Sequence, residues 1–451
     1  MAGLTDAHKV ALAAMLERCP DAMLKTVAAA VAPLPGDRAA ELRIMLAEEQ
    51  RDRTRRQFVM APLIRMFRAR PDKVEAMTFP APVLARLWKA ASIREPELLS
   101  RLDGEEPSVA VADRICLAAA AAVRDQPGLI WPGEDNPARL AALGDLAACL
   151  DLVHMARRGL PSLEVWLKRP DGDQIAELRL LLKDCAGIRL DGAQRVLEIL
   201  FSNLDDAVLI LRILTQTSCA VDQEDFLSAS ELAGFVDRLI TGVDLRAARI
   251  AAFKPAADIA RVADVIADLT WCASVLGELD VTLTLNPQSP WGKSVRDGRV
   301  AIAGRLSALL RAADKAVDQA LPMERVQTAG RMTRKAPQLD APIGGDTILA
   351  ARSLLRLVGS VRGPASTFGC EAERKTLVEA LTARLSDYAD QVLRMVNEGE
   401  AADEAHAMKL IAFVAQCLDL IAAADAARTV RRRAAVAGSP PEGREASSRA
   451  A

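Results

Sequence analysis

The sequence is poor in aromatic residues, which make up 3% of its 451 residues, and Tyr388 is its single tyrosine. Packing must therefore depend on aliphatic side chains, above all alanine and leucine, which suit close contact between helices. Hydrophobic residues make up 51% of the chain and charged residues 26%, so a large core can form and a disordered chain is excluded. The length allows several domains or one elongated repeat array.

A net charge is almost absent as well, because 58 basic side chains stand against 60 acidic ones. The chain as a whole has no field that would attract nucleic acid or anionic lipid, so binding of either would need a local patch. Arginine outnumbers lysine and alanine is abundant, a bias typical of GC-rich bacterial coding. An arginine is consequently not a sign of function by itself.

Spacings that would bind a metal or form a redox pair are missing. The eight cysteines are scattered without a C-x-x-C motif, and histidines occur only at His8, His154 and His406. Isolated thiols in apolar helices are usually small core residues. Motifs of serine hydrolases and zinc proteases are missing too. We therefore expect no enzymatic activity, no metal and no cofactor.

Long hydrophobic runs are also missing. The longest uncharged run, ICLAAAAAV at residues 115–123, is much shorter than the ~20 residues of a membrane span. Near the N-terminus, Asp6, His8 and Lys9 precede a short apolar run, which is typical of an amphipathic helix rather than a signal peptide. We expect a cytoplasmic protein without a transmembrane segment.

Helical periodicity is the main pattern that the sequence does contain. Apolar residues recur at steps of three and four through most of the chain, for example in residues 143–158 and 377–396. An alternating β-branched pattern stands out once, at residues 281–285 (VTLTL), where we expect one strand. The sequence therefore predicts an all-α fold, a multi-helical array of helical hairpins that is either solenoid-like or packed as bundles.

One pair of segments resembles an internal repeat. Residues 36–46 (GDRAAELRIML) match residues 172–182 (GDQIAELRLLL), and each copy opens a helix that Asp37 or Asp173 is placed to cap. The match predicts either a tandem duplication of units of about 140 residues or two independent helix starts of similar composition.

The expected organisation follows from these patterns and from the punctuation by proline and glycine. We expect a helical region over residues 1–280, a linker loop over 281–295 and a bundle of long helices over 296–435. Residues 436–451 are rich in proline, serine and charge, which is typical of a disordered tail.

The bundle of long helices contains two runs with heptad spacing. Between them, Asn397 and Gly399 stop one helix before another begins. The sequence predicts a coiled-coil-like antiparallel hairpin of residues 371–398 against 402–430. Its expected seam residues are Val378, Leu381, Leu385, Tyr388, Val392 and Met395 in the first run, and Ala407, Ile411, Val414, Leu418 and Ile421 in the second.

The expected strand is followed by the triplet GKS at residues 292–294, the end of the phosphate-binding pattern G-x-x-x-x-G-K-[ST]. The first glycine of that pattern is replaced by Pro287, and Pro290 lies inside the loop. Proline has no amide hydrogen to offer a phosphate, and the ring of Trp291 would obstruct close approach of the backbone. We therefore expect a linker rather than a nucleotide site.

The strongest candidate for a functional surface is the arginine-rich segment, residues 51–73. It holds eight basic side chains against Asp52 and Asp72, and Pro62 is expected to end its helix. If these arginines pair with neighbouring acids, the segment is an ordinary solvated helix face. If they do not, the segment is a surface for a partner.

From these observations we expect a non-enzymatic protein-interaction scaffold or adaptor of a bacterial cytoplasm. The alternative is binding of nucleic acid or of an anionic membrane surface through the same arginine-rich segment. An enzyme whose site is assembled from scattered helical residues is the third hypothesis. The expected partner-binding residues are Arg51, Arg55, Arg56, Phe58, Arg65, Met66, Phe67, Arg68 and Arg70.

Overall fold

The computed structural model describes residues 4–104, 107–134, 136–217, 223–255, 259–328 and 332–437. The chain divides into two compact units, which we call unit 1 (Met1–Val221 and Phe226–Ala233) and unit 2 (Asp222–Asp225 and Gly234–Ala451). The division lies earlier in the chain than the linker expected at residues 281–295. Among the described residues the fold is all-α apart from one two-stranded sheet.

Unit 1 is built from helices of one to seven turns. Its elements are α1 (Asp6–Arg18), α2 (Asp21–Val31), α3 (Asp37–Met60), the 3-10 turn η1 (Ile64–Phe67), α4 (Ala81–Arg94), α5 (Pro96–Leu99), η2 (Ser100–Leu102), α6 (Val109–Asp125), α7 (Pro127–Ile130), α8 (Pro137–Asp151), α9 (Val153–Gly159), η3 (Leu160–Ser162), α10 (Leu163–Leu167), α11 (Gly172–Ile188), α12 (Gly192–Asn203), η4 (Ala207–Leu209) and α13 (Ile210–Thr217), while α14 (Gln223–Ser228) crosses the division.

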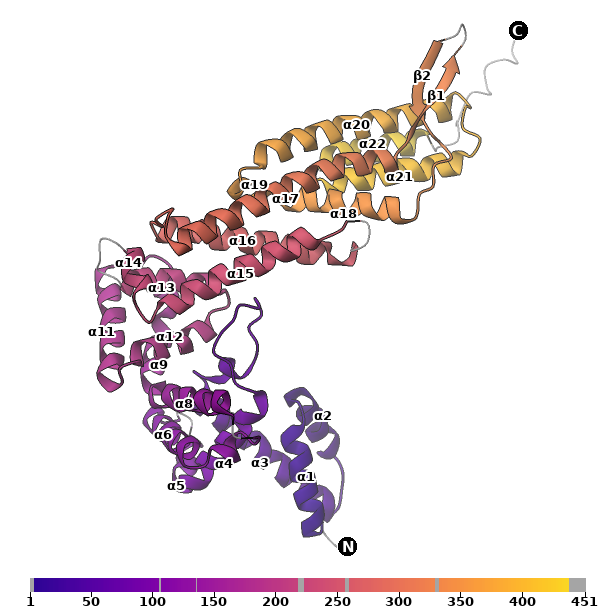
Figure 1. The fold of residues 1–451 in the computed structure, drawn as a ribbon. Coiled ribbons are helices and arrows are strands. Elements are labelled where there is room, and N and C mark those ends of the chain that lie inside the picture. The colour runs from indigo at the N-terminus through magenta and orange to yellow at the C-terminus, as the bar shows by residue number, and fades with distance from the viewer. Residues whose placement is uncertain are drawn as a thin grey trace. The chain divides into compact units, whose positions relative to one another are not determined.

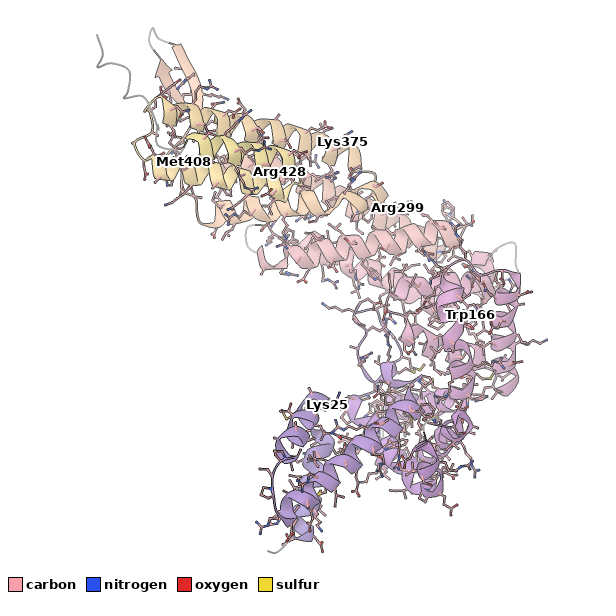
Figure 2. The ribbon with its side chains drawn as sticks, turned by 180° about the vertical axis from the view of Figure 1, so that it is seen from behind. Lys25, Trp166, Arg299, Lys375, Met408 and Arg428 are labelled. Atoms are coloured by element: carbon pink, nitrogen blue, oxygen red, sulfur yellow. The ribbon has the colours of Figure 1, made fainter. Side chains whose placement is uncertain are left out.

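Helix α6 lies at the centre of the N-terminal part of unit 1. It packs against α3, α4 and α8, and α8 in turn contacts α12. Most residues of the alanine-rich run at 115–123 are buried in α6, although Leu117 is exposed, and the small alanine side chains let neighbouring helices approach closely. Further along, the fully buried Trp166 lies among the helices of the same unit (Figure 2). Its role is that of a packing residue.

The two similar segments open α3 and α11, but their helix starts differ. Gly36, with φ of 102°, is the N-cap of α3, so Asp37 lies inside the first turn. Asp171 is the N-cap of α11 and forms a capping box with Gln174, so Asp173 also lies inside its helix. The expected capping by Asp37 and Asp173 is therefore wrong, and the duplication stays a prediction.

Unit 2 contains the longer helices and the sheet. Its elements are α15 (Ala233–Ala252), η5 (Ile259–Arg261), α16 (Val262–Thr282), α17 (Pro290–Ala320), β1 (Met323–Thr328), β2 (Met332–Pro337), α18 (Asp346–Ser360), α19 (Arg362–Thr367), α20 (Glu371–Asn397), α21 (Glu404–Leu420) and α22 (Ala424–Ala437). Helices α17, α18, α20, α21 and α22 lie side by side as a bundle (Figure 1). The disordered tail is expected at residues 436–451, but residues 436 and 437 are the last two of α22. Residues 438–451 lie outside the described residues.

The expected helical hairpin near the C-terminus corresponds to α20 packed against α21. The seam side chains Leu385, Val392 and Val414 are each 0% exposed, so both heptad stripes face the core of unit 2. The second helix is shorter than expected, because it ends at Leu420 and the chain turns at Ala422, whose φ is 64°. Coiled-coil geometry for this pair stays a prediction.

The strand expected at residues 281–285 is wrong. Helix α16 continues to Thr282, and the amide of Leu283 still donates to the carbonyl of Leu279 at 2.9 Å. No second strand lies beside this segment in the described part of the chain, so a helix satisfies its backbone groups better. The strands instead form an antiparallel hairpin in which Arg325 lies opposite Lys335. Their charged side chains conceal the strand pattern in the sequence.

Candidate functional site

The arginine-rich segment does not present the apolar docking face that its sequence suggests. Helix α3 ends at Met60, as Pro62 predicts, and η1 follows. Met66 is 0% exposed and Phe67 is 5% exposed, and the Phe67 ring packs against Phe79. These two side chains belong to the core of unit 1. The expectation that they contact a partner is therefore wrong.

Most arginines of the segment are paired with carboxylates of unit 1. The pairs are Arg53 with Glu49 at 2.6 Å and Asp21 at 2.5 Å, Arg55 with Asp103 at 2.5 Å, Arg65 with Asp205 at 2.7 Å, and Arg70 with Asp72 at 2.6 Å. Among the described residues, no carboxylate forms an ion pair with Arg51, Arg56 or Arg68. The segment is consequently not one continuous positive face.

The pair formed by Arg70 and Asp72 joins two distant parts of unit 1. Arg70 donates to the carbonyl of Phe201 and stacks 4.4 Å from the centre of its ring. Asp72 accepts from the amides of Val74 and Ala207 at 3.2 and 2.8 Å. Burial by itself would raise the pKa of Asp72, but the hydrogen bonds and charge of Arg70 lower it below its usual value. The role of this pair is structural.

The GKS triplet lies in the first turn of α17 and not in a phosphate-binding loop. The hydroxyl of Ser289 accepts from the amide of Gly292 at 2.9 Å, which caps the helix. A Cβ atom on Gly292 would lie 2.0 Å from the carbonyl oxygen of Asn286, so the chain folds back tightly on itself here. The amides of Asn286, Gln288, Ser289 and Gly292 already donate to oxygen atoms of the protein, so they are not available to a phosphate.

Replacing Lys293 with alanine is therefore expected to leave the stability of the protein essentially unchanged. The side chain is exposed, and a surface substitution of this kind usually changes the free energy of unfolding by less than about 0.5 kcal/mol. Thermal melting and titration with ATP would check this expectation. ATP binding that is tight in the wild type and lost in Lys293→Ala would contradict it.

The buried cysteines are poor candidates for reactive groups. Burial raises the pKa of Cys185 to about 11 and those of Cys116, Cys272 and Cys417 to about 12. It raises the pKa of Cys149 in the same way. These thiols are protonated at neutral pH, and a thiol is a much weaker nucleophile than a thiolate.

No group of three or more His, Cys, Asp or Glu side chains in the described ranges is placed to hold a metal ion. No helix of the described chain combines the length and the apolar character that crossing a bilayer requires.

A groove of about 410 Å³ near the N-terminus is lined by three helices. Helix α1 packs on α3, and the indole nitrogen of Trp88 in α4 donates to both carboxylate oxygens of Asp52 in α3 at 2.8 Å. Helices α1 and α4 thus form two walls with α3 between them. The lining residues are Val10, Ala13, Ala14 and Glu17 from α1, Glu49, Asp52 and Arg56 from α3, and Ala85, Trp88, Lys89 and Ser92 from α4.

Helix α1 exposes many of its apolar side chains, and some of them line this groove. Most of its sequence, DAHKVALAAMLER, is apolar, yet Leu16 is its only buried residue. Val10 is 71% exposed and Met15 is 59% exposed. The next helices add exposed apolar side chains at Met23 and Ile44. Of these four side chains only Val10 lines the groove, where it adjoins the exposed Ala13 and Ala14. Exposed apolar patches mark interaction sites in many soluble proteins.

Of the expected partner-binding residues, the groove includes only Arg56. Arg51 and Arg68 are exposed elsewhere, and Phe58 is half-buried beside the guanidinium of Arg157. Sequence reasoning missed the groove because its alanines and valine have the spacing of ordinary core positions. One feature of the sequence does point to the groove. Helix α1 contains more apolar residues than one neighbouring helix can cover.

No protein-family model, no curated protein and no solved structure matches this chain.

Proposed function

We propose that this chain is a protein-interaction scaffold and that the groove between α1 and α4 receives a helix of a partner protein. The observation that carries the proposal is the apolar character of α1, of which only Leu16 is buried. Eight of the 13 residues of α1 are apolar and six of these eight are exposed, so part of this helix is open to a partner. A partner would remove the exposed surface of Val10 and its neighbours from water.

The shape and lining of the groove support a helical partner. The walls are formed by Ala13, Ala14 and Ala85, whose small side chains leave room for another helix to approach closely. Helices that bind in grooves use an apolar stripe with side chains at steps of three and four. The proposal assigns no catalytic role to the chain.

The alternative, binding of nucleic acid or an anionic membrane surface through residues 51–73, has less support. Arg53, Arg55, Arg65 and Arg70 are paired with carboxylates, and such pairs would have to break before phosphates could be bound. We therefore do not propose it.

The groove can be blocked by a single substitution at Ala14, which is exposed and lines the wall formed by α1. In Ala14→Glu a bulky charged side chain would fill the space and would be desolvated on docking, so we expect at least a tenfold loss of partner capture, equivalent to about 1.4 kcal/mol or more. The measurement is affinity capture from a lysate of the producing organism, followed by quantification of each captured protein.

The matched control is Ala11→Glu, which places the same side chain three residues earlier on the same helix. Ala11 is exposed but does not line the groove, so we expect it to retain the partner. If both variants capture the same proteins as the wild type, the groove is not the docking site and the proposal is wrong.

A further inference from the structure

The charges on the two walls of the groove differ in sign. Glu17 is the only charged lining residue of α1, and Lys89 is the only one of α4. Both side chains are exposed, and within the described residues neither forms an ion pair. The groove thus has one acidic wall and one basic wall.

The other charged residues of the groove are mostly occupied. Glu49 pairs with Arg53 at 2.6 Å, and Asp52 accepts from the indole of Trp88. Arg56 lies one turn beyond Asp52 on α3 and has no ion pair in the described part of the chain. The charges available to an occupant are therefore one carboxylate on the α1 wall, one ammonium on the α4 wall and one guanidinium on α3.

The hydroxyl oxygen of Ser92 lies beneath the groove and forms no hydrogen bond with the described residues. Because this atom is buried, an occupant of the groove does not reach it.

We infer that the groove selects an amphipathic helix whose narrow apolar stripe has basic residues along one flank and acidic residues along the other. This inference rests on the proposed function and specifies its partner. The basic flank lies against Glu17 and the acidic flank against Lys89 and Arg56, as charged flanks do beside the apolar seam of a coiled coil.

This arrangement also selects the direction of the bound helix. A helix that is turned end to end in the groove exchanges its two flanks, which places like charges against each wall. Opposite charges across an interface mainly provide specificity and register, whereas the apolar stripe provides most of the affinity. The groove therefore prefers one of the two directions for a helix with mixed flanks.

The test uses three synthetic stapled helices with the same stripe of alanine and leucine. The mixed helix has lysines on one flank and glutamates on the other, the acidic helix has glutamates on both, and the basic helix has lysines on both. Binding to the full chain is measured by fluorescence anisotropy at low and high salt. For the wild type we expect the mixed helix to bind about threefold to tenfold more tightly than the other two at low salt, with a smaller difference at high salt.

Charge reversals of the walls should change the preference in a defined way. Glu17→Lys makes both walls basic and should favour the acidic helix, whereas Lys89→Glu makes both walls acidic and should favour the basic helix. The double variant should again prefer the mixed helix, which then binds in the opposite direction. The control is Lys25→Glu, which should leave the preference unchanged. Lys25 is an exposed lysine of α2 (labelled in Figure 2) and is not among the residues that line the groove.

The outcomes separate this inference from the proposed function. If all three helices bind equally, or if none binds while Ala14→Glu still loses a captured protein, the flank preference is wrong and the scaffold role stands. If no helix binds and Ala14→Glu captures everything that the wild type captures, both are wrong.

Discussion

Replacing Asp72 with alanine is expected to lower the free energy of unfolding by about 3–5 kcal/mol, because it leaves the buried guanidinium of Arg70 without its counter-charge. The Arg70 side chain is 3% exposed and that of Asp72 is 10% exposed. The substitution also removes the acceptor for the amide of Ala207. Urea denaturation of the full chain, followed by circular dichroism, would measure the loss.

The pH dependence of this loss has a definite sign. The pKa of Asp72 is lower in the folded protein than in the unfolded chain, where it is near 3.9. The pair therefore contributes its full stability above about pH 4 and loses it as the pH falls through the folded pKa. We expect the difference between wild type and Asp72→Ala to shrink below about pH 4.

Asp103→Ala is the matched control. Asp103 also binds an arginine of the segment through both oxygens, but its side chain is 34% exposed. Water screens this pair, so we expect a loss of about 0–1 kcal/mol. If both variants lower the free energy of unfolding equally, burial gives the Arg70–Asp72 pair no extra stabilising effect. The pair would then not hold residues 68–79 against the end of α12.

The second large effect is expected from Leu385→Asp in α20. Leu385 is 0% exposed and lies in the stripe that faces α21, so aspartate would place a charge without a partner in an apolar core. We expect the free energy of unfolding to fall by roughly 3–5 kcal/mol. Protonation of the buried carboxyl group would reduce this loss. Thermal melting should show a large decrease in the melting temperature.

Ala380→Asp provides the control in the same helix, because Ala380 is exposed. It introduces the same side chain with only the small helix-propensity cost, below about 1 kcal/mol. Unchanged melting of Leu385→Asp would mean that the stripe of α20 is not part of a core.

The all-α fold class and the ends of several helices could be predicted from the sequence. Apolar residues at steps of three and four give an all-α protein, and the ends follow from local chemistry: Pro62 removes a backbone donor after α3, and Gly399 takes a positive φ of 72° after α20. The failure of the GKS triplet as a phosphate loop was also predictable, since Pro287 and Pro290 have no amide hydrogen. Each of these features depends on residues that are close in the sequence.

The arginine-rich segment could be located but not interpreted from the sequence. Arg55 pairs with Asp103, 48 residues away, and Arg65 pairs with Asp205, 140 residues away. No pattern within the segment indicates such partners. An arginine in the sequence is therefore equally compatible with an exposed binding surface and with a structural ion pair. The two cases are distinguished by the residues that the fold brings next to it.

Local sequence patterns specify most of the helices and which stripe of each helix is apolar. Which stripes are covered depends on how the helices pack in the folded protein: Met66 and Phe67 are buried, whereas Val10 is exposed and lines a groove. The physical reason is that local periodicity depends on 3.6 residues per turn, whereas burial depends on which distant helices pack against the stripe. In α1 the described chain supplies too few neighbours, and this shortfall is the basis of the proposed docking site.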